Sequence, residues 1–210
     1  MSVQPSLQEQ NGYYKRLKSK AWLDVVEDLH IRIHSEIPQE HKHALLPRTR
    51  SYFQELLTGN NGALWGVFDE ETNNLVGMCA VQLCPNWVAA KVAGRITYPD
   101  LDGYFWRLCA EDRVAVIQSL GVLRSSHGKR MAQGLIQDAC LWAYSQQCTH
   151  VFAQIAQDNN CSWAKFVRQG FSIVADWKAG HPRYMLYREL SPHMFMGETA
   201  MITANTRLHA

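Results

Sequence analysis

The stretch that decides the fold is residues 114–132, which read V-A-V-I-Q-S-L-G-V-L-R-S-S-H-G-K-R-M-A. The first ten of these residues are mostly apolar and predict a buried strand. A polar turn follows, and from Met131 apolar residues recur at helical spacing as far as about Gln147. Gly121 lies inside the strand, where it packs nothing. Such a glycine often marks a bulge or the close approach of another backbone or a ligand.

The first residues of this helix carry charges of the unfavourable sign. Lys129 and Arg130 lie where the helix dipole prefers an anion. A phosphate or pyrophosphate bound to the free amides would remove the conflict. An ordinary turn, with Ser125 or Ser126 as the cap and solvated basic side chains, accounts for the pattern equally well. Neither a G-x-x-x-x-G-K-[ST] loop nor a G-x-G-x-x-G turn is present, which removes most ATPase, GTPase and dinucleotide-binding functions.

Elements on both sides of this stretch predict a single α/β domain with a mixed sheet. Upstream, the patterns indicate an edge strand, two helices and a hairpin, at 13–18, 22–33, 47–58, 63–68 and 75–83. Downstream, they indicate a strand, a helix and a closing hairpin, at 151–155, 160–168, 170–177 and 184–190. The domain is predicted to span 13–190, between a flexible N-terminus at 1–12 and a tail at 191–210.

Residues 85–112 follow no regular pattern. They combine large aromatic side chains with four acids, Asp100, Asp102, Glu111 and Asp112. Loops with many large apolar rings usually cover something, and ring faces together with carboxylates attract an ammonium group. We interpret this insert as a lid and a pocket for a cationic ligand.

Composition bounds the class of protein. The 210 residues carry 21 Lys plus Arg and 19 Asp plus Glu, and 47% of them are hydrophobic. These values exclude a disordered polyelectrolyte and argue against a nucleic-acid coat protein. The six cysteines form no C-x-x-C pair, so we expect reduced, buried thiols. No signal peptide or apolar stretch of about 20 residues is present, so we expect a cytoplasmic protein without nucleic-acid or membrane partners. A homodimer is left open.

A second motif lies at residues 159–171, which read N-N-C-S-W-A-K-F-V-R-Q-G-F. Together with residues 114–132 it resembles the signature segments of the GCN5-related N-acetyltransferases (GNAT). The second segment fits the family pattern N-x-x-[AS]-x-x-x-[YF]-x-x-x-G-F at Asn159, Ser162, Phe166, Gly170 and Phe171. The first departs from the pattern [RQ]-x-x-G-x-[GA], because His127 replaces Arg or Gln and Arg130 replaces the first Gly. Only Ala132 fits strictly there.

The resemblance implies a mixed central sheet that is splayed between two parallel strands, with helices on both faces. It also implies that acetyl-CoA binds in the opening as a co-substrate, its pantetheine paired with the first parallel strand and its pyrophosphate on the loop at 127–132. The cofactor-binding residues that it implies are Leu120, Val122, Leu123, His127, Gly128, Lys129, Arg130, Met131, Ala132, Asn159, Ser162 and Phe166.

The activity implied is direct transfer of an acetyl group to a primary amine within a ternary complex. A small-molecule amine is favoured over a protein, because no extended acidic groove is evident. A base must accept the amine proton, and Glu111 and Asp112 are the preferred candidates, with Asp100 or Asp102 as alternatives. Gln118 occupies a position where some relatives carry a Glu that acts as the general base.

The acid that would protonate the leaving thiolate is not assigned. Phe166 stands where the family commonly has a Tyr. Ser162, Cys161 or Tyr144 would have to replace that Tyr, or the thiolate leaves unassisted, which a thiol pKa of ~8.5 permits. Two other functions stay open: a catalytically weak relative that senses acyl-CoA, and an unrelated phosphate-binding protein. No metal site is predicted, since a solvated polar face accounts for the spacing of Glu27, His30 and His34.

Overall fold

The computed structural model describes residues 12–83, 113–126, 130–177 and 181–191. The expected N-terminal segment and tail lie outside these ranges, apart from Gly12 and Ser191. The expected insert at 85–112 lies outside them entirely.

The order of elements follows the sequence prediction closely. The strands are β1 (Gly12–Leu17), β2 (Gly62–Asp69), β3 (Leu75–Leu83), β4 (Val114–Val122), β5 (His150–Ala156), β6 (Ser172–Trp177) and β7 (Arg183–Glu189). The α-helices are α1 (Leu23–Glu36), α2 (Arg50–Thr58), α5 (Met131–Ser145) and α6 (Asn160–Arg168). Short 3₁₀ turns are η1 (Lys20–Trp22), η2 (Gln39–Ala44) and η4 (Arg124–Ser126).

Side-chain caps set several of these boundaries. Ser19 caps η1, accepting a hydrogen bond from the Ala21 amide at 3.2 Å. The second helix starts later than the predicted Pro47, because Thr49 provides its N-cap and accepts from the Tyr52 amide. Local capping chemistry therefore places the start of α2 three residues downstream of the proline.

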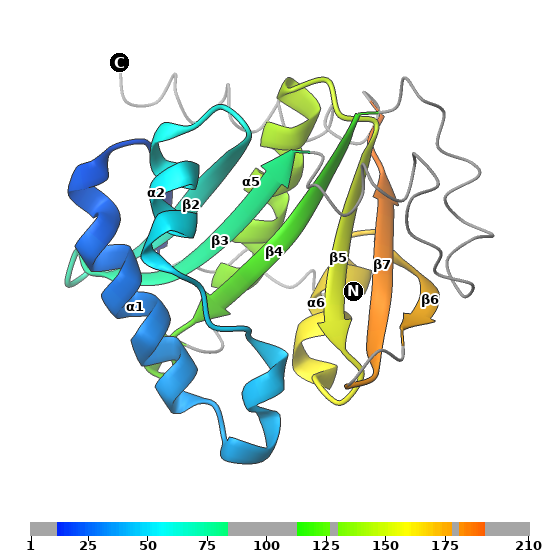
Figure 1. Ribbon diagram of the computed structural model, residues 1–210, viewed down its shortest axis with the longest axis horizontal. Helices are drawn as coiled ribbons and strands as arrows, with labels where there is room; N and C mark the ends of the chain where they lie inside the picture. Colours follow the sequence, from blue (N-terminus) through cyan, green and yellow to red (C-terminus); the bar gives the residue numbers. More distant parts are fainter. Residues whose placement is uncertain (1–11, 84–112, 127–129, 178–180, 192–210) are drawn as a thin grey trace, which may run out of the picture.

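The strands form one sheet in the order β1-β2-β3-β4-β5-β7-β6 (Figure 1). All neighbouring pairs are antiparallel except β4 and β5, which run parallel. The predicted mixed sheet with one central parallel pair is therefore confirmed. The sheet consists of two antiparallel halves, β1–β4 and β5–β7–β6, that meet only at this pair.

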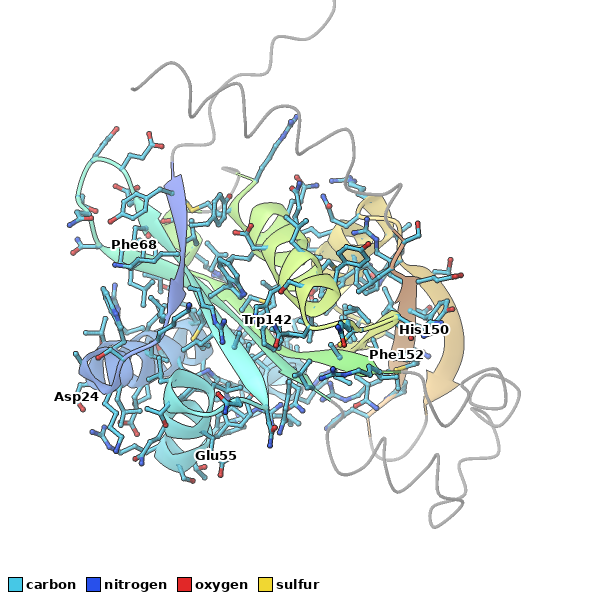
Figure 2. The ribbon with its side chains drawn as sticks, turned by 90° about the horizontal axis from the view of Figure 1, so that it is seen from above. Asp24, Glu55, Phe68, Trp142, His150 and Phe152 are labelled. Atoms are coloured by element: carbon cyan, nitrogen blue, oxygen red, sulfur yellow. The ribbon has the colours of Figure 1, made fainter. Side chains whose placement is uncertain are left out.

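Helices cover both faces of the sheet, as expected. Figure 2 shows α1 and α2 on one side of the strands and α5 on the other. The core face of α5 carries fully buried side chains at helical spacing, including Leu135, Ile136 and Ala139. At 15 residues α5 is the longest helix in the described ranges, and none of those helices is long and apolar enough to cross a membrane.

Two sequence expectations about individual side chains are wrong. His30 does not lie on a solvated face: it is buried on the inner side of α1 and packs edge-to-face against Phe53, with ring centroids 5.3 Å apart. The inner face of α1 repeats at Val26, His30 and Ile33, so the histidine belongs to the core period. Cys161 is exposed on α6, whereas Cys79, Cys140 and Cys148 are buried as predicted.

Candidate active site

The central parallel strands separate after a short contact. The pairing of β4 with β5 runs from Val114 with His150 to Ile117 with Ala153 and ends there. One residue later, β4 contains a bulge: Ser119 pairs with Ala80 and Ile117 with Val81, so Gln118 has no partner of its own on β3. An extra residue bends a strand and increases its local twist. The bulge thus accounts for the gap between the lower ends of β4 and β5 in Figure 1.

Arg48, which precedes α2, forms hydrogen bonds with the bulge. Its Nε donates to the Ser119 hydroxyl and its Nη2 donates to the Gln118 carbonyl, both at 3.2 Å. The guanidinium also lies 4.7 Å from the ring centre of Tyr52, a cation–π arrangement. Nothing in the sequence pattern pointed to Arg48, because its partners are 70 and 71 residues away along the chain.

Gly121 marks a close approach but not the bulge. It pairs in regular register with Met78, three residues beyond the irregularity. A Cβ at this position would lie 2.8 Å from Cγ2 of Ile33, so the glycine allows α1 to pack directly onto β4. Of the two alternatives that Gly121 indicated, the close approach is therefore present and the bulge is not, and the close neighbour is a helix side chain.

The start of α5 has an unusual backbone. Arg130 precedes the helix as its N-cap and adopts the left-handed conformation, with φ of 49°. A glycine tolerates this conformation without strain. The first intrahelical bonds are donated by Gln133 and Gly134 to the Arg130 carbonyl, at 2.9 and 3.3 Å. The amides of Met131 and Ala132 precede these bonds, at the end of the helix where the dipole favours an anion.

A cavity of about 860 Å³ occupies the opening between β4 and β5. Its walls come from residues 117–122 of β4, the start of α5, the end of β5, the face of α6, and α1 with η2. Three cations line it, Arg130, Lys165 and Arg168, whereas no Asp or Glu does among the residues that the structure describes. This charge distribution suits an anionic ligand.

Most of the predicted cofactor-binding residues meet at this cavity although they come from separate segments. Those that line it are Leu120, Val122, Arg130, Met131, Ala132, Asn159, Ser162 and Phe166. Leu123 does not line it, being buried, with its amide donating to the Val76 carbonyl at 2.8 Å. His127, Gly128 and Lys129 lie outside the described residues.

The first turn of α6 is organised by its cap. The Asn159 Oδ1 accepts from the Ser162 amide at 3.2 Å, and Lys165 Nζ donates to the Cys161 carbonyl at 2.9 Å. Further along the helix, Phe166 is buried and packs edge-to-face on Phe171, with ring centroids 5.1 Å apart. Phe166 therefore presents an apolar ring to the cavity.

The predicted catalytic residues Glu111 and Asp112 lie outside the described residues, as do Asp100 and Asp102. Gln118 lines the cavity, and its side-chain amide donates to Oε1 of Gln82 at 2.7 Å. Of the alternative acids, Cys161 and Ser162 line the cavity, while Tyr144 in the last turn of α5 does not.

Sequence reasoning missed one wall of the cavity. Ile33 and Ile37 of the α1 end, and Ala44 and Leu45 at the end of η2, line the side facing α6 and β5. Ile33 and Ile37 are four residues apart and continue the apolar face of α1 past its buried part. This spacing was the signal from which the α1 wall could have been predicted. The stretch 39–44, Q-E-H-K-H-A, has no apolar period and gave none.

Comparisons with known proteins agree with this geometry. The family model for the acetyltransferase (GNAT) family matches residues 23–171. Among solved structures, NAA60 of Arabidopsis thaliana in complex with acetyl-CoA is similar with a TM-score of 0.64 at 16% identity, covering 85% of this chain and 98% of that one. A probable acetyltransferase from Staphylococcus epidermidis has a TM-score of 0.60 at 16% identity, covering 86% and 99%. The ribosomal-protein-S18-alanine N-acetyltransferase of Escherichia coli has a TM-score of 0.59 at 9% identity, covering 86% and 94%. No curated protein sequence matches the chain.

Proposed function

Because the chain belongs to the acetyltransferase (GNAT) family, whose co-substrate is acetyl-CoA, we propose that it acetylates a primary amine by direct transfer within a ternary complex. The observation that carries the proposal is the cavity of about 860 Å³ at the point where β4 and β5 separate. A helix N-terminus and three cations meet there beside a strand edge. A volume of this order suits a cofactor-sized ligand.

The donor's anionic and polar parts have matching partners in the cavity. The amides of Met131 and Ala132, with the Arg130 side chain, would bind the pyrophosphate. The β4 backbone around Leu120 and Val122, which lies beyond the last pair with β5, would bind the amides of the pantetheine as an added strand does. Lys165 lies on the α6 side of the same cavity and adds positive charge.

The chemistry of the transfer sets what the other residues must do. The neutral amine attacks the thioester carbonyl carbon, its proton passes to a base, and the carbon–sulfur bond breaks to release the CoA thiolate. We assign the base to Glu111 or Asp112, since Gln118 accepts no proton usefully. Phe166 has no proton to give, so the thiolate leaves unassisted or takes a proton from Ser162 or Cys161. A thiol pKa of ~8.5 makes unassisted departure feasible near neutral pH.

We propose that the acceptor is a small-molecule amine. A protein or peptide N-terminus is the competing acceptor. One similar structure is the ribosomal-protein-S18-alanine N-acetyltransferase, and another is the NatC complex bound to Gag peptide and CoA. A second function, acyl-CoA sensing with little catalysis, is favoured by Phe166 and Gln118 at positions where catalysis would gain from Tyr and Glu.

A panel of amines distinguishes these possibilities. Free CoA thiol is measured with acetyl-CoA and amino acids, polyamines, aminoglycosides or short peptides with free N-termini. We expect steady, amine-dependent thiol release for at least one small amine, lowered by two orders of magnitude or more in Glu111→Gln or Asp112→Asn. Saturable acetyl-CoA binding without amine-dependent release would support the sensor instead. Release with peptides alone would overturn the small-molecule acceptor.

A further inference from the structure

A cluster of histidines joins the two halves of the sheet across the wide end of the opening. The 3₁₀ turn η2 lies in the chain between β1 and β2, which are strands of the half-sheet that contains β4. The turn from β5 to α6 follows a strand of the other half-sheet. In Figure 1 these two segments, blue and yellow, lie next to each other at the lower edge of the molecule. The contact is made by His41 and His43 of the H-K-H sequence at 41–43.

Asp158 is the centre of this cluster. His41 Nδ1 lies 3.0 Å from Asp158 Oδ2, and His43 Nε2 lies 3.1 Å from Asp158 Oδ1. The His43 ring stacks on His181, with centroids 4.1 Å apart, and Arg183 Nη2 donates to the His43 carbonyl at 2.7 Å. These contacts join η2 to the β5–α6 turn and to the start of β7.

The cluster is held together by hydrogen bonds and charge. Partial burial acts to raise the pKa of Asp158, but hydrogen bonds from His43 and His41 outweigh it and lower that pKa. The carboxylate is therefore ionised near neutral pH. On Arg183, burial and the neighbouring Arg48 lower the pKa, while Asp158 acts in the opposite direction. Within the described ranges, no group of three or more His, Cys, Asp or Glu side chains is arranged to hold a metal ion.

The residues next to the cluster line the cavity. Ala44 and Leu45 follow His43 directly, and Asn159, which caps α6, follows Asp158. The wall made by Ala44 and Leu45 is apolar and has no cation of its own, so it is unsuited to the phosphates of the donor. The donor has its matching partners at the α5 start and along β4, which leaves the η2 wall for the acceptor.

We propose that Asp158 is a positioning residue that holds η2 across the opening and so fixes the wall against which the acceptor amine binds. This role rests on the proposed acetyl transfer. Hydrogen bonds accepted by an ionised carboxylate are shorter and stronger than those between neutral groups. Replacing the Asp158 carboxylate by a neutral amide should therefore loosen the contact between η2 and the β5–α6 turn.

The test compares Asp158→Asn and His43→Gln with the control Asp24→Asn. Asp24 makes an exposed ion pair of 2.6 Å with Arg50, which joins α1 to α2 and involves no residue of the β5–α6 turn. Each variant is studied by acetyl-transfer kinetics and by hydrogen exchange of residues 39–45. For Asp158→Asn we expect the acceptor KM to rise about threefold to tenfold, with kcat and the acetyl-CoA KM within about twofold of wild type.

Exchange of residues 39–45 should be faster in both variants but not in the control. Unchanged exchange would show that the contact does not hold η2, whatever the activity. Faster exchange with an unchanged acceptor KM, or an equal rise in the acetyl-CoA KM, would overturn the positioning role. If the wild type acetylates no amine, the proposed function fails and this role fails with it, while the exchange data still report on the contact.

Discussion

At the scale of single residues, Arg130 shows how this chain departs from its family. It occupies the position of a family glycine and keeps the left-handed backbone for which a glycine is suited. An L-residue with a Cβ accepts this conformation at a cost of about 1 kcal/mol. Because the side chain lines the cationic part of the cavity, we infer that its charge contributes to binding an anionic ligand.

Replacing Arg130 by Asn separates charge from backbone, since Asn tolerates the left-handed region. The Kd for acetyl-CoA, measured by calorimetry, should rise roughly threefold to tenfold in Arg130→Asn, while the unfolding midpoint in urea changes little. Arg124→Asn is the matched control, because Arg124 is exposed and does not line the cavity. An unchanged affinity for acetyl-CoA in Arg130→Asn would mean that this side chain does not contact the phosphates.

At the scale of elements, β4, α5 and α6 were predictable almost to the residue. Their apolar residues recur at clear strand or helix spacing, and Asn159 provides the N-cap of α6. The turn η2 was not predictable, because Q-E-H-K-H-A contains no apolar period and its bonds go to partners 115 and 117 residues away. The bulge at Gln118 was not predictable either, since the only signal was Gly121, which indicated a bulge or a close approach, whereas Arg48 bonds the irregularity at Gln118.

Helix α5 contains a partly buried carboxyl group, Asp138, whose burial the apolar pattern of the helix did not predict. Burial raises the pKa of Asp138 from 3.8 to about 6, and the Asp138 charge together with burial raises the pKa of Tyr14, on β1, to about 12. Because the pKa of Asp138 is higher in the folded state, its ionisation destabilises the fold. This destabilisation is absent below about pH 4 and complete above about pH 6.

We therefore expect Asp138→Asn to stabilise the protein at pH 8 and not at pH 4. A shift of about two units corresponds to at most about 3 kcal/mol, and Asp138 is only partly buried, so a gain on the order of 1–2 kcal/mol is expected. Urea unfolding at the two pH values measures it, with the exposed Asp28→Asn as control. A loss of stability at pH 8 would indicate that the carboxylate has a favourable partner in the fold.

At the scale of the whole molecule, the fold is two antiparallel half-sheets that meet along four residue pairs. The sequence predicted the strands and a mixed sheet, because each strand pattern is local, and the resemblance to the GNAT family implied the central parallel pair. It did not predict the walls that α1 and η2 add to the cavity, since these depend on packing between segments far apart in the chain. The general base stays a prediction, because Glu111 and Asp112 lie outside the described ranges.

The central claim is that acetyl-CoA binds in the opening between β4 and β5. Hydrogen exchange of the wild-type protein with and without acetyl-CoA tests it most directly. We predict slower exchange in peptides that cover residues 118–123 and 130–134, and at the start of α6, with no change in α2. Protection confined to other segments, or no protection at saturating acetyl-CoA, would contradict it.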